Sequence, residues 1–210
     1  AEQHSSVARS ARVIGLGSDA IVTVPSDSSG AMDPDAARAA ILGHTGPLIV
    51  NAQAGNVNAG AFDPIDAIAD AVVERRSERD DVWLHVDGAF GLWVRASSRR
   101  AALAAGAERA DSWACDAHKW LNTPYDCGIS IVADRAVLAA AGLIHLRRIR
   151  VARRRVRRAG LAVQSLRCRR ALPEGRHWVG RVRAHPRQLR RPRRSLCEVT
   201  RKVMQDHACT

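Results

Sequence analysis

Blocks of apolar and polar positions alternate along the first two thirds of the chain and predict strands and helices in turn. Short, β-branched apolar runs bounded by Gly, Pro or polar residues predict strands, and these lie at 20–24, 48–52, 82–86 and 129–132. Longer blocks with apolar residues three and four apart predict helices, and these lie at 5–16, 33–42, 63–76 and 135–141. Strands that alternate with helices are typical of an α/β fold with a mainly parallel, doubly wound sheet.

The ends of these helices carry local signals. Asp33-Pro34 and Asp63-Pro64 each place an acid at the N-cap and proline at the first helical position, and Gly17 is the expected C-cap of the first helix. The segment GLGSDA at 15–20 matches a dinucleotide fingerprint. That motif needs a strand before it and a helix after it. The predicted order here is helix and then strand, so we reject a dinucleotide site.

Charge divides the chain at about residue 146. Residues 1–146 contain 11 Arg and one Lys against 18 acids, whereas residues 147–210 contain 20 Arg and one Lys against three acids. Hydrophobic periodicity predicts no element in the second part. We therefore expect an α/β domain over 1–146 and an Arg-rich segment over 147–210.

Cysteine usage and hydropathy bear on the compartment. The five cysteines form no paired framework and no C-x-x-C motif, which favours a reducing, cytoplasmic compartment. We find no signal peptide and no apolar run near the ~20 residues of a membrane span, so no membrane partner is expected. The first residue is Ala rather than Met, and we expect a fragment of a longer chain.

The segment DSWACDAHKWLNTPYDCG at 111–128 holds the first candidate chemistry. Lys119 is the only lysine among residues 1–146, which use Arg 11 times. Arg cannot form an imine, whereas a partly desolvated Lys can lose its proton and attack an aldehyde. His118 precedes it, and Trp113 and Trp120 flank it. The alternative is a surface lysine at a strand end.

A second segment, VWLHVDGAFG at 82–91, is an apolar strand that ends in Asp87. It places a carboxylate at the carboxyl edge of the sheet, where open α/β sheets bind ligands. A pyridine-type cofactor needs such an acid to keep its ring nitrogen protonated. Gly88 and Ala89 would let a flat ring lie close. The alternative is an Asp that caps the next turn.

Two further segments are candidates for contacts with such a ligand. His4, in QHSS at 3–6, can stack on an aromatic ring beside a helix start that binds an anion. N-capping by Ser5 or Ser6 is the alternative. QAGNVNAG at 53–60, which contains Asn56, is a loop of small residues at the same sheet edge, or else an ordinary turn.

Together these segments resemble the group II pyridoxal-phosphate-dependent decarboxylases, which include aromatic-amino-acid, histidine and glutamate decarboxylases, over residues 1–145. The H-V-D-x-A and H-K-W motifs occur in the family's order, and Lys119 follows Asp87 by 32 positions. The resemblance implies an incomplete large domain of the aspartate-aminotransferase-like fold (fold type I). It also implies pyridoxal 5'-phosphate, no metal, an amino-acid substrate that loses CO₂, and a homodimer.

The resemblance also implies residue roles. Lys119 would bind the cofactor through an imine, Asp87 would pair with the pyridine nitrogen, and His4 and Ala89 would lie on the two ring faces. His118, with Asp116 and Ser112 nearby, would help to hold the phosphate or the lysine region. Asn56 would lie in a loop near the cofactor. The chain departs from the family at Gly88, commonly Ala, and at Ala117, often Pro.

Alternatives remain open at this point. Other lyase chemistry of the same fold type, such as aldol cleavage or desulfuration, is the enzymatic one. A catalytically dead remnant or a basic nucleic-acid-binding protein comes from a different class. For residues 147–210, dense Arg would give salt-dependent nucleic-acid binding, and a disordered tail is a second hypothesis. A frameshift near 143–147 is the third, and we favour it because the change falls where the family's chain should continue.

Overall fold

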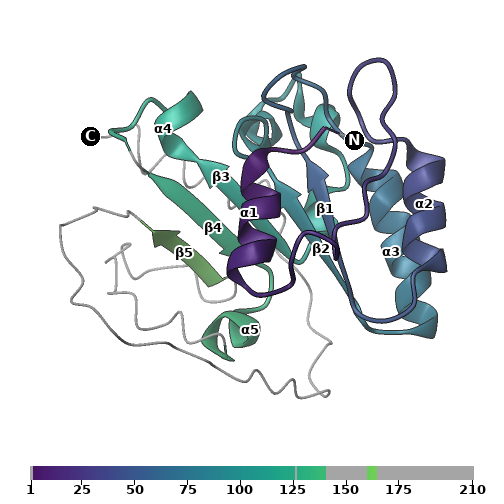
Figure 1. Cartoon of the computed structure of the whole chain (residues 1–210). Helices are drawn as coiled ribbons and strands as arrows, with labels where there is room; N and C mark the ends of the chain where they lie inside the picture. The colour runs from purple at the N-terminus through teal and green to yellow at the C-terminus, as the bar shows by residue number, and fades with distance from the viewer. Residues whose placement is uncertain (1, 126, 141–159, 165–210) are drawn as a thin grey trace.

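The computed structural model describes residues 2–125, 127–140 and 160–164, and its strands form one sheet in the order β1-β2-β3-β4-β5 (Figure 1). The strands are β1 Leu48–Gln53, β2 Val82–Asp87, β3 Ser112–Asp116, β4 Gly128–Val132 and β5 Gly160–Gln164. β1, β2 and β3 pair in parallel, whereas β4 and β5 pair antiparallel. The expected mainly parallel sheet is therefore wrong for its second half. Residues 117–127 are too few for a parallel crossover, which needs a dozen or more.

The four predicted helices form close to their predicted positions, together with others that the pattern does not predict. The α-helices are α1 Ser5–Val13, α2 Pro34–Gly43, α3 Ile65–Glu78, α4 Ala117–Trp120 and α5 Arg135–Ala140, and the 3₁₀ helices are η1 Leu92–Ala96, η2 Ala101–Ala104 and η3 Ala107–Arg109. α1 ends before Gly15, which has a left-handed φ of 85°, and so before the expected Gly17 cap. Within the described residues no helix is long and apolar enough to cross a membrane.

Two strand predictions differ from the structure. Residues 20–24 form no strand and lie outside the sheet, and Val22 is 66% exposed. Since a strand is stabilised by pairing with its neighbours, β-branched composition alone is not sufficient there. β3 forms without having been predicted, and β5 lies in the Arg-rich region where no element was expected.

The Asp residues of the two Asp-Pro sequences have different structural roles. Asp33 caps α2 as predicted, because its Oδ1 accepts the Ala36 N–H at 2.8 Å. The prediction for Asp63 is wrong, since α3 begins after Pro64 with no side-chain cap. The buried Asp63 carboxylate instead accepts the backbone N–H groups of Met32 at 2.8 Å and Gln53 at 2.7 Å. These two bonds fix the end of β1, and burial raises the pKa of Asp63.

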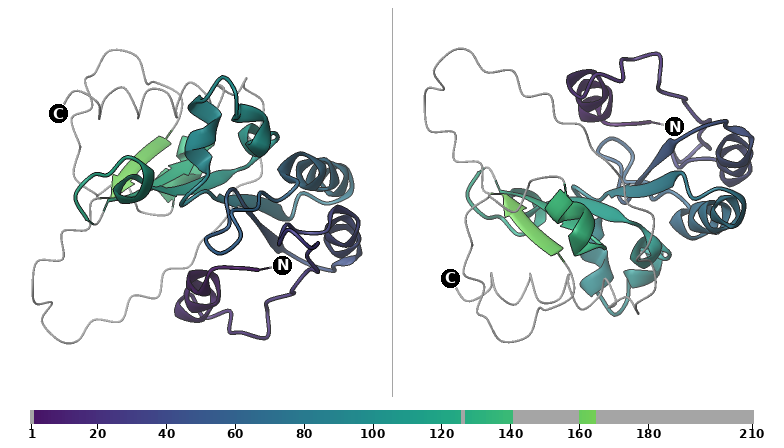
Figure 2. Two further views of the ribbon diagram at one scale, coloured as in Figure 1. Left: turned by 90° about the horizontal axis from the view of Figure 1, so that it is seen from above. Right: turned by 90° about the horizontal axis from the view of Figure 1, so that it is seen from below.

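The two faces of the sheet differ in what covers them. α3 and the 3₁₀ helices lie on one side and α1 on the other, as both views in Figure 2 show. The covered face is apolar and buried, and its strand residues are Val50, Ala52, Val82, Leu84, Val86, Trp113, Cys115, Ile129 and Ile131. The face toward α1 carries mixed polar and apolar side chains, among them Ile49, which is 60% exposed. α1 itself has no buried residue.

Candidate functional site

The carboxyl ends of β1, β2 and β3 bring candidate residues to one edge of the sheet. Asp87 ends β2 and is in register with Gln53 of β1 and Ala114 of β3, and Asp116 ends β3 two positions further on. This edge borders a hollow of about 2190 Å³ between the sheet and α1. Five of the eight predicted site residues line it: His4, Asp87, Ala89, Asp116 and Lys119.

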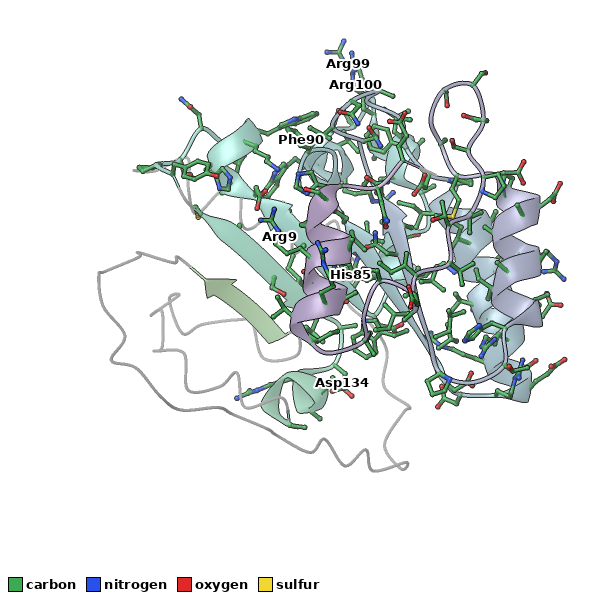
Figure 3. All side chains as sticks on the ribbon, in the orientation of Figure 1. Arg9, His85, Phe90, Arg99, Arg100 and Asp134 are labelled. Carbon is green, nitrogen blue, oxygen red and sulfur yellow. The ribbon has the colours of Figure 1, made fainter. Side chains whose placement is uncertain are left out.

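Lys119 lies in α4, directly after β3. Its Nζ is 2.8 Å from Oδ2 of Asp116 and 4.0 Å from the centroid of the Phe90 ring. In Figure 3, Phe90 is labelled at the edge of the sheet near α4. The side chain of Lys119 is 26% exposed, so the amine faces the hollow with a carboxylate and an aromatic face as neighbours. Both neighbours are groups that attract a cationic amine.

The backbone around Asp87 is fixed by close packing. Its carbonyl accepts the Ala54 N–H at 2.8 Å, and its Oδ1 accepts the Ala89 N–H at 3.1 Å. A Cβ on Gly88 would lie 2.4 Å from the Cβ of Leu92, and one on Gly91 would lie 2.5 Å from the carbonyl oxygen of Ala54. Glycine is therefore required at both positions, and Gly88 is one of the two residues that depart from the family pattern.

His118 lies behind Lys119 and is not among the residues that line the hollow. Its Nδ1 accepts the Cys127 N–H at 3.0 Å, and its Nε2 is 3.9 Å from Oδ2 of Asp116. A ring nitrogen that accepts an N–H carries no proton, so the neutral ring has its proton on Nε2, toward Asp116. Tyr125 packs edge-on at 4.4 Å between ring centroids. His118 thus lies beside the carboxylate that contacts Lys119, at a distance longer than a direct hydrogen bond.

The remaining predicted residues occupy supporting positions. The buried Ser112 accepts from Nε1 of Trp83 at 2.8 Å, and its Oγ is 2.7 Å from Nδ1 of His85. Asn56 donates to the Glu2 carbonyl at 3.1 Å, which holds the N-terminal segment beside β1. His4 is exposed and is itself the N-cap of α1, rather than Ser5 or Ser6, because it accepts the Ser6 N–H at 3.3 Å.

Sequence reasoning missed three residues of this face. Phe90 lies in the segment 82–91 that contains Asp87, but the sequence alone indicates no role for it. Trp83 and His85 alternate with Asp87 along β2 on the face toward the hollow. The two-residue period of a strand places 83, 85 and 87 on one face, and this signal could have found them.

The comparisons with known proteins agree with this geometry. Residues 1–162 match the family model described as the pyridoxal-dependent decarboxylase conserved domain. An L-2,4-diaminobutyrate decarboxylase of Rhizobium meliloti is 36% identical over 66% of this chain and 28% of the relative. A cysteine sulfinic acid decarboxylase of Mus musculus is 38% identical over 65% of this chain and 28% of the relative. The crystal structure of mouse CSAD has a TM-score of 0.59 and 34% identity over 66% of this chain and 29% of that chain.

The fold defines an α/β protein of the fold type I class of pyridoxal-phosphate enzymes, with the large-domain architecture. The chain belongs to the pyridoxal-dependent decarboxylase family, because the family model matches more than half of it. It spans a little over a quarter of the length of the relatives that it matches. Pyridoxal phosphate is the family's cofactor, and the residues present fit it. An amine, a carboxylate at a strand end and a small residue line the same hollow.

Proposed function

We propose that the protein is a carboxy-lyase that uses pyridoxal phosphate to release CO₂ from an amino acid. The observation that carries the proposal is that Lys119 and Asp87 line one hollow at the carboxyl edge of the parallel strands. When bound, the cofactor supplies an electron sink for the electrons that the departing carboxylate leaves behind. The names of the relatives from Rhizobium meliloti and Mus musculus are those of amino-acid decarboxylases, which supports this substrate class.

In this proposal Lys119 holds the cofactor through Nζ, and Asp116 serves the lysine rather than the phosphate. A carboxylate is only an acceptor, so it repels a phosphate and attracts the amine that lies 2.8 Å away. Asp116 would orient this amine and accept its proton when the amine attacks. His118, whose Nε2 is 3.9 Å from Asp116 Oδ2, would help to hold this lysine region.

The ring of the cofactor would lie between the sheet edge and α1. Asp87 would pair with the ring nitrogen, Ala89 would lie against one ring face, and His4 would stack on the other. All three line the hollow. Ser112 and Asn56 act indirectly in this proposal, since their side chains bond to neighbouring residues of the fold.

The proposal is tested by measuring CO₂ release from a panel of the protein amino acids together with 2,4-diaminobutyrate and cysteine sulfinate. The full chain is supplied with pyridoxal phosphate and compared with Lys119→Ala, Asp87→Asn and the exposed control Asp35→Asn. We expect at least one amino acid to release CO₂ with the wild type and with Asp35→Asn, and none with Lys119→Ala. If cofactor is bound at Lys119 and no amino acid releases CO₂, the proposed reaction is wrong.

The assembly and location of the protein also belong to the proposal. A cytoplasmic homodimer is supported by the free thiols of Cys115 and Cys127 and by exposed apolar residues around the hollow, such as Ile49 and Val22. We place the end of the cofactor-binding domain near residue 146. The hypotheses of nucleic-acid binding, disorder or a frameshift concern residues 147–210. Apart from 160–164, these lie outside the described residues.

A further inference from the structure

A chain of three hydrogen-bonding side chains crosses β2 and β3 beneath the hollow. His85 of β2 is in register with Ser112 of β3, and the Ser112 Oγ is 2.7 Å from His85 Nδ1 and 2.8 Å from Trp83 Nε1. Ser112 is 8% exposed. Trp83 and His85 line the same hollow as Asp87. Figure 3 shows His85 on the sheet behind α1.

The chemistry of the three groups fixes the direction of the first bond and favours one direction for the second. An indole N–H can only donate, so the Ser112 oxygen accepts from Trp83. The serine hydroxyl then has one proton to donate, and His85 Nδ1 lies at hydrogen-bond distance from it. A serine oxygen can also accept twice, but among the described residues Trp83 and His85 are the only partners of this buried hydroxyl. Its proton is satisfied if an unprotonated His85 Nδ1 accepts it, and the proton of the neutral ring is then on Nε2.

The surroundings of His85 favour the uncharged ring. Burial lowers the pKa of His85, and the charge of Asp87, two positions along the same strand, acts in the opposite sense to a smaller extent. The in-register neighbours of His85 are Asn51 on β1 and Ser112 on β3, and neither carries a charge. Lys119, on α4, pairs with Asp116.

We propose that Ser112 positions His85 as a neutral Nε2–H imidazole beside Asp87, so that the Asp87 charge stays available to the cofactor's ring nitrogen. A cationic His85 would compete for that carboxylate, because it would offer a positive charge on the same strand face. His85 is thus a positioning residue for Asp87, and the inference rests on the proposed function.

The first test uses ¹⁵N-histidine NMR of the full chain without cofactor, with the His85 signal identified by its absence in His85→Gln. We expect the shift of an unprotonated Nδ1 in the wild type and in Trp83→Phe, which keeps the Ser112–His85 bond. We expect this shift to change in Ser112→Ala and to return in Ser112→Thr, which keeps a hydroxyl. A wild-type His85 that is protonated on Nδ1 at neutral pH would overturn the proposal.

The second test measures the affinity for pyridoxal phosphate and the absorbance of the bound cofactor. Loss of the Ser112 bond should weaken binding about fivefold and shift the absorbance band, whereas Ser130→Ala, on the exposed part of β4, should change neither. Unchanged affinity and absorbance in Ser112→Ala would overturn the link to Asp87. If the wild type has the expected tautomer but binds no pyridoxal phosphate, the proposed function fails and the role for Asp87 fails with it. Because the NMR result would still show the expected His85 tautomer, the failure would lie in cofactor binding and not in the hydrogen-bond chain.

Discussion

Lys119 and Asp116 form an ion pair within a single turn of chain, with Nζ 2.8 Å from Oδ2. The pair forms because β3 ends at Asp116 and α4 begins at the next residue, which brings a side chain three positions later back over the strand end. The Phe90 ring lies 4.0 Å from the same Nζ and contacts the amine from a second side. The reactive group of the proposal is thus held in place before any ligand arrives.

Replacement of Asp116 by Asn is expected to slow the attachment of pyridoxal phosphate to Lys119 about tenfold. The variant loses a charge-assisted hydrogen bond and the group that accepts the proton of the amine. The measurement is the rate at which borohydride-trapped label appears on Lys119. Asp35→Asn, an exposed change in α2, should keep the wild-type rate. A rate in Asp116→Asn equal to or above that of the wild type contradicts the role of Asp116.

The stability of the protein should depend on pH through His85. Its folded-state pKa lies below the ordinary value of 6.5 because the ring is buried, so the unfolded chain binds more protons in this range. Stability is then complete above about pH 6.5 and decreases as pH falls toward the folded pKa. His85→Gln should flatten this decrease in urea unfolding, while His44→Gln should keep it. The same pH dependence in His85→Gln and the wild type would show that His85 is not responsible.

Arg75 joins α3 to the end of α2 and to the turn before β1. It is 1% exposed and donates to the carbonyls of Ile41 at 2.6 Å, His44 at 2.8 Å and Gly46 at 2.6 Å, and it also pairs with Asp81. Arg75→Met leaves the Ile41 and Gly46 carbonyls without this donor, while Arg79 still donates to the His44 carbonyl at 3.1 Å, and it is expected to cost about 3–5 kcal/mol of unfolding free energy.

The matched control for Arg75→Met is Arg38→Met, which removes an Arg from an exposed pair with Glu74. Exposed ion pairs contribute little to stability, so the urea midpoint of this variant should stay close to that of the wild type. Equal midpoints for the two variants would contradict the structural role of Arg75.

Gly88→Ala restores the residue common in the family, yet it should destabilise this chain. The new Cβ would lie 2.4 Å from that of Leu92 and 3.1 Å from the Ala114 carbonyl oxygen. Overpacking of this kind costs about 1–3 kcal/mol. Gly43→Ala in α2, where a Cβ meets nothing within 4 Å, is the control and should be neutral or stabilising. A Gly88→Ala chain as stable as the wild type would refute the packing argument.

The elements that could be predicted from the sequence are those whose own pattern determines them. β1 and β2 are mostly apolar runs, and Asp33 caps α2. Asp87 and Lys119 could be recognised because one ends a strand and the other is a single lysine among many arginines. In each case the decisive signal lies within a few residues of the feature.

The parts that could not be predicted depend on residues distant in sequence. β3 reads SWACD, with no β-branched residue, and it becomes a strand through pairing with β2 and β4. Asp63 has the same local sequence as Asp33, and its partners Met32 and Gln53 are 31 and 10 positions away. The bond between Ser112 and His85 likewise requires the register of two strands.

The measurement that tests the central claim most directly is the mapping of the cofactor's attachment point. The full chain is incubated with pyridoxal phosphate, reduced with borohydride and digested, and the labelled peptides are identified by mass spectrometry. We predict one labelled residue, Lys119, and loss of that label in Lys119→Ala. Absence of label, or label spread equally over Lys202 and the N-terminal amine, would show that the family's motifs are present in this chain without its cofactor site.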